Sequence, residues 1–195
     1  MRSALPPSTG TSPRSSNSWP PSPPCSPKQY GFAEQIGALK QLQDEGKVRH
    51  IGLSEVGVAE IETAAEVAPI AAVQNMYNLA TRDHDPVIDY TAERCIAFVP
   101  FFPIALGGHA GPDSPLTAVA KAVGVTPAQT ARAWLLHRAP NMVPIPGTSP
   151  PDHLKENLHA ADITLSEGQF RRIDEEGRGA AYGSQGGMTN PSTSA

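Results

Sequence analysis

A glycine and two hydroxyl residues just before a helix start form the stretch of this sequence most suited to binding chemistry. Residues 145–157 read IPGTSPPDHLKEN, with Gly147, Thr148 and Ser149 ahead of the expected helix. Glycine permits close backbone approach and an unusual φ. Ser149 or Asp152 could cap the helix, whose first N–H groups would point at the loop. The stretch predicts a phosphate-binding turn, the alternative being a surface turn that enters a helix.

Three other apolar runs also end in polar or aromatic residues. They end in Ser54–Glu55, Gln74–Asn75 and Phe101–Phe102. In β/α proteins with parallel strands, working residues lie at the carboxyl ends of the strands. Four such ends in succession are a stronger signal than any one of them, so we expect these residues to line one edge of a sheet.

Helical patterns alternate with the apolar runs along most of the chain. Near-continuous apolar strands separated by helices favour a parallel sheet covered by helices, hence an α/β fold. Periodicity alone leaves open whether the sheet is flat or part of a barrel. We expect strands over 48–53, 70–74, 96–102 and 141–145, and helices over 32–46, 57–67, 86–94, 116–123, 126–137, 151–158 and 166–174. Thr126 is the expected N-cap of its helix.

The stretches VRHIGLSE (48–55), AAVQNMYN (71–78) and the IPGTS turn resemble the second half of the aldo/keto reductase family. The resemblance covers about residues 32–177. It implies a partial TIM-type (β/α) barrel, roughly strands five to eight with their helices. It also implies NADP(H)-dependent reduction of aldehydes or ketones, small-molecule carbonyl substrates.

The same resemblance implies the cofactor contacts. The family holds the nicotinamide amide with residues that match Ser54 and Gln74, and stacks an aromatic residue, here Phe101, on the ring. Glu55 stands where the family usually has asparagine, and a carboxylate cannot donate the hydrogen bond that an amide can.

At the other end of the cofactor, the resemblance implies that the turn holds the 2′-phosphate. His153 takes a position that is basic in many relatives and can donate to phosphate. The resemblance places Glu156 and Asn157 near the adenine. The implied contacts at this end are Gly147, Thr148, Ser149, His153, Glu156 and Asn157.

No catalytic residue is assigned. The family's proton donor is a tyrosine whose pKa is tuned by lysine, aspartate and histidine, all on the first strands of the barrel. Those strands would precede Phe32, where Tyr30 is the only tyrosine and lacks such a set. Tyr77 belongs to the QNMYN loop and is expected to be structural. We therefore expect an aldo/keto reductase homologue by descent, with the catalytic half missing from this chain.

Two alternatives remain at this stage. One is a catalytically inactive NADP-binding fragment, or a half barrel that depends on a partner or self-associates through exposed sheet edges. The other is an interaction protein that works through the proline-rich arm, where PPSPP could bind an SH3-like partner. We interpret residues 1–31 as a disordered Pro/Ser-rich arm, 32–177 as the half barrel and 178–195 as a flexible tail.

The composition of the chain excludes further classes of protein. The chain has 195 residues, enough for one domain, and a net charge of −4 without the clustered basic residues of a nucleic-acid footprint. Its apolar runs are too short to span a membrane. Two cysteines, Cys25 and Cys95, make neither a disulfide framework nor a metal site. This composition fits the cytoplasm.

Overall fold

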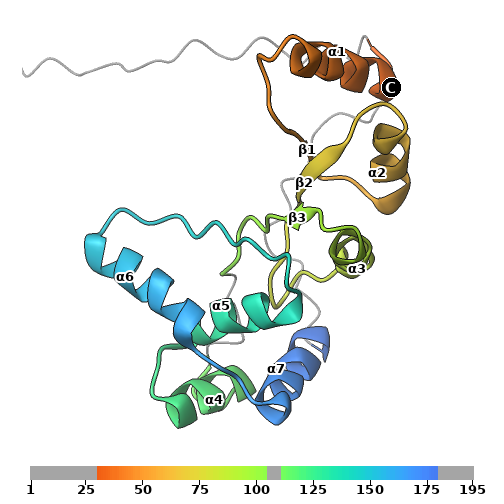
Figure 1. Ribbon diagram of the computed structural model, residues 1–195. Coiled ribbons are helices and arrows are strands. Elements are labelled where there is room, and N and C mark those ends of the chain that lie inside the picture. The colour runs from red at the N-terminus through yellow and green to blue at the C-terminus, as the bar shows by residue number, and fades with distance from the viewer. Residues whose placement is uncertain (1–29, 105–110, 180–195) are drawn as a thin grey trace, which may run out of the picture. The chain divides into compact units, whose positions relative to one another are not determined.

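The computed structural model describes residues 30–104 and 111–179 (Figure 1). The chain divides into two units, Met1–Gly31 and Phe32–Ala195. The expected Pro/Ser-rich arm therefore lies outside the described residues except for Tyr30 and Gly31. Most of the expected tail, from residue 180 onward, also lies outside them.

A parallel sheet in the order β1-β2-β3 forms the first part of the larger unit. Its strands are β1 (Ile51–Ser54), β2 (Ile70–Gln74) and β3 (Ala97–Phe98). Parallel neighbours need a crossover connection, and the crossovers here are α2 (Val58–Ala65) and α3 (Asp85–Glu93). The expected parallel α/β arrangement is confirmed for this part.

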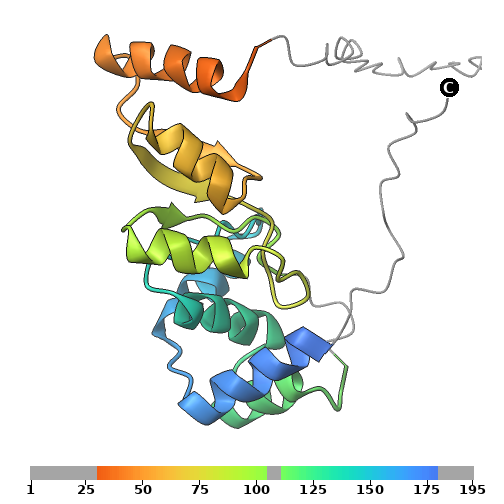
Figure 2. The same cartoon turned by 90° about the vertical axis from the view of Figure 1, so that its right-hand side faces the viewer.

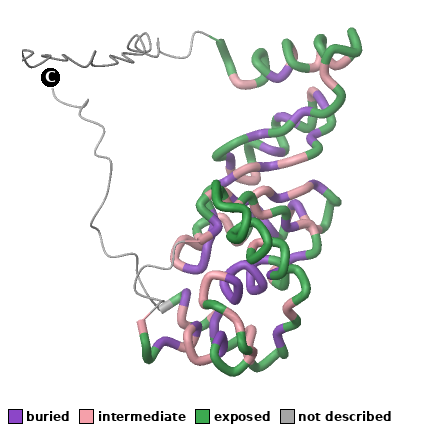
Figure 3. Tube along the Cα trace, turned by 90° about the vertical axis from the view of Figure 1, so that its left-hand side faces the viewer, coloured by how far each residue is buried: buried purple, intermediate pink, exposed green. Residues whose placement is uncertain are grey.

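In the part of the chain that the structure describes, helices cover one face of the sheet and leave the other open. Helices α2 and α3 lie on the same side of the strands (Figures 1 and 2), and α1 (Phe32–Asp44) contacts β1 and α2. Along β1, Ile51 and Leu53 are buried whereas Gly52 and Ser54 are exposed. Figure 3 colours the trace of the described residues by burial. The period of two places the polar Ser54 on the open face.

Helices make up the rest of the described chain. The central helix α5 contacts α4, α6 and α7. Its N-cap is Thr126, as predicted: the Thr126 hydroxyl accepts a hydrogen bond from Gln129 N (3.2 Å), and Thr126 N donates to Gln129 Oε1 (3.0 Å). These elements are α4 (Pro115–Val123), α5 (Pro127–Arg138), α6 (Pro151–His159), the 3-10 turn η2 (Ala160–Asp162) and α7 (Glu167–Gly179).

The third strand is much shorter than the predicted 96–102. Regular pairing with β2 covers only Ala97 and Phe98. Beyond them the pairing continues as single contacts, such as the bond from Val99 N to Val73 O (2.8 Å). Pro100 and Pro103 cannot donate to a ladder, so a longer strand was the wrong prediction.

The fourth predicted strand, 141–145, is not a strand. It is reduced to one bridge between Met142 and Phe98, with Val143 N donating to Phe98 O (2.8 Å). Pro144 and Pro146 remove two of the donors that a ladder would need. The segment nevertheless runs beside β3, so it keeps the turn that follows it near the carboxyl edge of the sheet.

The last helix runs further than the predicted 166–174. Helix α7 continues to Gly179, and Gly177 within it is buried. A Cβ atom at Gly177 would lie 2.5 Å from the backbone oxygen of Leu79. Glycine therefore lets α7 touch the loop after β2.

Candidate functional site

The carboxyl edge of the sheet brings together three of the residues singled out in the sequence. Ser54 and Gln74 are directly paired in the β1–β2 register. Met76, two residues after Gln74, bridges to Phe101. Since paired residues and residues two apart share a face, Ser54, Gln74 and Phe101 lie along one edge on the open face of the sheet.

Glu55 adopts a backbone conformation that side chains rarely take. Its φ is +52°, in the left-handed region. Glu55 N donates to Gln74 O (3.0 Å), and its carboxylate oxygen Oε1 accepts from Met76 N (2.6 Å). The carboxylate is thus engaged with the backbone of the loop after β2, a contact that the sequence did not indicate.

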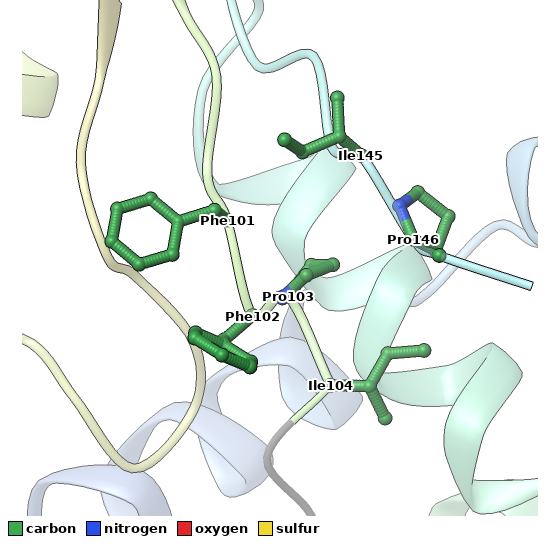
Figure 4. Close-up of a pocket in the computed structure, with 7 residues that line it drawn as sticks. Phe101, Phe102, Pro103, Ile104, Ile145 and Pro146 are labelled. Atoms are coloured by element: carbon green, nitrogen blue, oxygen red, sulfur yellow. The ribbon is translucent and has the colours of Figure 1, made fainter. Parts of the chain in front are cut away.

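A cavity of about 460 Å³ lies between the segment after β3 and the segment before the turn (Figure 4). One wall is Phe101–Ile104 and the other is Ile145–Gly147. Phe101, the residue expected to stack, and the first residue of the expected phosphate turn therefore belong to the lining of the same cavity. Its walls are aromatic and aliphatic, as is usual for cofactor pockets.

The turn Gly147–Ser149 is exposed and leads into α6. Two expectations for it are wrong. The N-cap is Pro150, with no side-chain cap hydrogen bond, so neither Ser149 nor Asp152 caps the helix. Gly147 does not have a positive φ, and a Cβ atom there would meet nothing within 4 Å.

The start of α6 still suits an anion. No side chain caps it, Pro151 carries no N–H, and the remaining N–H groups of the first turn need an outside acceptor. Asp152 would repel an anion here, but Lys155 Nζ lies 2.9 Å from its carboxylate and offsets that charge.

Three candidate residues lie along α6. His153 and Asn157 are four apart and share one face of the helix, with Glu156 beside them. Glu156 O accepts from Gln129 Nε2 of α5 (3.4 Å), which ties this helix to α5. None of the residues of α6 is buried, so the helix is lightly packed.

Tyr77 cannot serve as the proton donor. It is fully buried, and its hydroxyl donates to Asp85 Oδ1 (2.6 Å). Burial, reinforced by the hydrogen bond to Asp85, raises the pKa of Tyr77 far above its ordinary value. Its ring stacks on Trp134 at 6.0 Å between centroids, so the side chain is part of the core, as expected.

Asp85 is the centre of a charge cluster behind the site. Arg82, Arg138 and Arg178 lie 3.3, 3.3 and 3.4 Å from its carboxylate. Burial, the largest effect, raises its pKa, but the Tyr77 hydrogen bond and the arginines together outweigh it and lower the pKa. The cluster holds together α3, α5 and α7.

Parallel β/α units with a candidate site at their carboxyl edge define an α/β protein related to the β/α barrels. The family model described as "Aldo/keto reductase family" matches residues 15–177. The chain belongs to the aldo/keto reductase family. The match begins well before Phe32, within the segment that we interpreted as a separate arm.

Among its relatives, an uncharacterized oxidoreductase, C215.11c, of Schizosaccharomyces pombe is 44% identical over 145 residues, covering 74% of this chain and 47% of that protein. Pyridoxine 4-dehydrogenase of Escherichia coli is 44% identical over 149 residues, covering 76% and 51%. The chain therefore spans about half the length of these relatives.

The solved structures include an aldo/keto reductase from Klebsiella pneumoniae in complex with NADP and acetate. It matches with a TM-score of 0.68 and 26% identity, over 76% of this chain and 55% of that one. Within the described ranges, no helix is long and apolar enough to cross a membrane.

Proposed function

We propose that this chain supplies the NADP(H)-binding part of an aldo/keto reductase, an enzyme that reduces aldehydes or ketones to alcohols. The observation that carries the proposal is the convergence of the candidate contacts. The Ser54–Gln74 pair lies at one edge of the sheet, and Phe101 and Gly147 line one cavity. The solved relative with NADP adds support.

At the nicotinamide end, the chain's own residues would orient the ring. The Ser54 hydroxyl and the Gln74 amide offer both donors and acceptors for a carboxamide. Phe101 offers a face on which the ring can stack. Glu55 cannot take the family's asparagine role, because it has no donor and its carboxylate is engaged by Met76 N.

At the phosphate end, the turn Gly147–Ser149 and the uncapped start of α6 would hold the 2′-phosphate. Hydroxyl groups of Thr148 and Ser149, backbone N–H groups and the helix N-terminus are all donors. His153 would also donate to the phosphate, and Glu156 and Asn157 would lie on the adenine side. NADPH, when bound, supplies the hydride for carbonyl reduction.

A second candidate function is a cofactor-binding chain without reductase activity of its own, acting with a partner that completes the barrel. Two observations favour it. The sheet has an open face on which Ser54 is exposed, and Tyr77 is buried against Asp85. We propose that the 195-residue chain alone does not reduce carbonyls.

Two measurements test these proposals together. NADPH fluorescence titration of the folded protein should show saturable binding, weaker than for a relative with a closed barrel because the sheet here has an open face. NADPH oxidation with 4-nitrobenzaldehyde should stay at the buffer rate. Absence of binding by protein with a folded circular dichroism spectrum would remove the first proposal. Clear turnover would remove the second.

A further inference from the structure

Asn75 lies at the junction of the three loops that carry the candidate nicotinamide contacts. It follows Gln74 directly, at the end of β2, and is fully buried. A buried carboxamide must satisfy two donors and an acceptor. Where those bonds go therefore shows what this residue fixes in place.

The carboxamide binds the backbone of the loop after β1. Oδ1 accepts from Val56 N (3.1 Å), and Nδ2 donates to Val56 O (2.8 Å). Asn75 thus holds both polar groups of a residue only two positions after Ser54. The remaining Nδ2 hydrogen faces His84 Nδ1 (3.0 Å) at the start of α3.

The backbone of Asn75 reaches the third loop. Phe101 N donates to Asn75 O (3.2 Å), which fixes the segment that carries the stacking ring. One buried residue is therefore bonded to the loop of Ser54, is adjacent to Gln74 and is bonded to Phe101. The side chain of Asn75 makes the first of these links and its backbone oxygen makes the last.

We propose that Asn75 is a positioning residue for the cofactor: its carboxamide fixes the loop that carries Ser54 against the strand end that carries Gln74, and its backbone oxygen holds the segment of Phe101. The inference rests on the proposed function, since it concerns the nicotinamide end of NADP(H). Asn75 itself is buried behind this edge and touches no ligand in this role.

The side-chain chemistry leaves little choice at this position. Only a short carboxamide donates twice and accepts once from one branch point. Aspartate keeps the acceptor for Val56 N but loses both donors and places a charge against Val56 O. Leucine keeps the volume and loses every bond. Either change removes at least one of the two bonds to Val56 and leaves the Glu55 bonds to Gln74 O and Met76 N as the remaining links at this point.

The test compares two ligands on Asn75→Asp and Asn75→Leu. NADPH carries the nicotinamide, whereas adenosine 2′,5′-bisphosphate carries only the phosphate end. We expect NADPH affinity to fall about tenfold, the change that loss of one or two buried hydrogen bonds brings. Affinity for the bisphosphate should stay within about twofold, since the hydrogen bonds of the Asn75 side chain go to Val56 and His84 and not to the turn before α6.

Asn141→Asp is the matched control. Asn141 Nδ2 also donates to two acceptors, Thr91 Oγ1 (3.1 Å) and Ile96 O (2.7 Å), at the other end of the β3 segment. We expect this variant to lower stability without changing the ratio of the two affinities. A similar change in the ratio would overturn the proposal, because it would show a general effect of loosening the fold.

Hydrogen exchange of the ligand-free protein supplies a second readout that needs no cofactor. The amide of Phe101 is the internal reference, because its acceptor is the backbone oxygen of Asn75, which both variants keep. Exchange at the amide of Val56 should rise most in Asn75→Leu, which loses the acceptor for this N–H, and should not rise in Asn141→Asp. Unchanged exchange at Val56 in Asn75→Leu, or an unchanged ratio of affinities, overturns the inference. Failure of the unsubstituted protein to bind NADPH overturns the proposed function itself, and with it the role of Asn75 in cofactor placement.

Discussion

Replacement of Gly177 by alanine should destabilise the protein. A Cβ atom at Gly177 would lie 2.5 Å from the backbone oxygen of Leu79 and 3.0 Å from its Cδ1. A side chain could turn away, but a backbone oxygen yields only if the loop or the helix shifts. Overpacking of this kind costs about 1–3 kcal/mol. Alanine regains about 1 kcal/mol of helix propensity over glycine, so we expect a net loss of up to about 2 kcal/mol.

The same helix offers the control. Gly168 lies in the first turn of α7, and a Cβ atom there would meet nothing within 4 Å. Gly168→Ala should raise stability by up to about 1 kcal/mol. Urea unfolding followed by tryptophan fluorescence measures both variants, since Trp134 contacts the aromatic side chain of Phe170 on α7. Equal midpoints for the two variants would refute the close contact of α7 with the Leu79 loop.

Three further outcomes follow from the structure. Gly147→Val should weaken NADPH binding without loss of stability, because the Cβ position is open in the ligand-free protein; fluorescence titration and urea unfolding check this, with Gly168→Val as the matched substitution. Asp85 has a lowered pKa in the folded state, so its contribution to stability is present above about pH 4 and is lost as the pH falls through the folded pKa. In Asp85→Asn the free energy of unfolding should fall less steeply as the pH is lowered; an unchanged pH dependence would contradict the stabilising role of the charge cluster. Thr126→Ala should cost about 1 kcal/mol through loss of the capping box of α5, measurable as a lower urea midpoint, whereas an unchanged midpoint would mean that the cap contributes nothing.

The sequence predicted the edge on which the candidate residues gather, because that edge follows from local pattern. Apolar runs that end in Ser54 and Gln74 become adjacent parallel strands whatever their exact lengths. The same local information predicted the cap of α5 at Thr126. The expected roles of these residues came from the family resemblance, because hydrophobic periodicity carries no information about ligand contacts.

Other features depend on contacts that local pattern does not encode. Each proline removes only one backbone N–H donor. In the segments after Ile96 and Asn141, several prolines together leave single bridges in place of the predicted strands. The left-handed turn at Glu55 is unusual for a residue with a side chain, and its reason lies across the sheet at Met76 N. The bonds of Asn75 to Val56 likewise span residues far apart in sequence.

The expected capping of α6 was wrong because two prolines follow the turn directly and occupy the positions where the helix begins. Pro150 takes the N-cap position and Pro151 the first helical position. Proline suits the first position of a helix, where its missing N–H costs nothing. The helix therefore begins without help from Ser149, which stays exposed in the turn.

Under the proposed function, the light packing of α6 would make folding of this helix part of cofactor binding. A helix of nine residues with no buried side chain gains little from tertiary contacts and is marginal by itself. A ligand that binds only the ordered turn shifts the local folding equilibrium of α6 toward the helix. The free energy needed to order the helix reduces the apparent affinity for that ligand. A phosphate ion bound at the turn would order part of α6 before the cofactor binds. The affinity for NADP(H) should therefore report helix formation as much as contact chemistry, and thermal protection by the cofactor should appear first in α6.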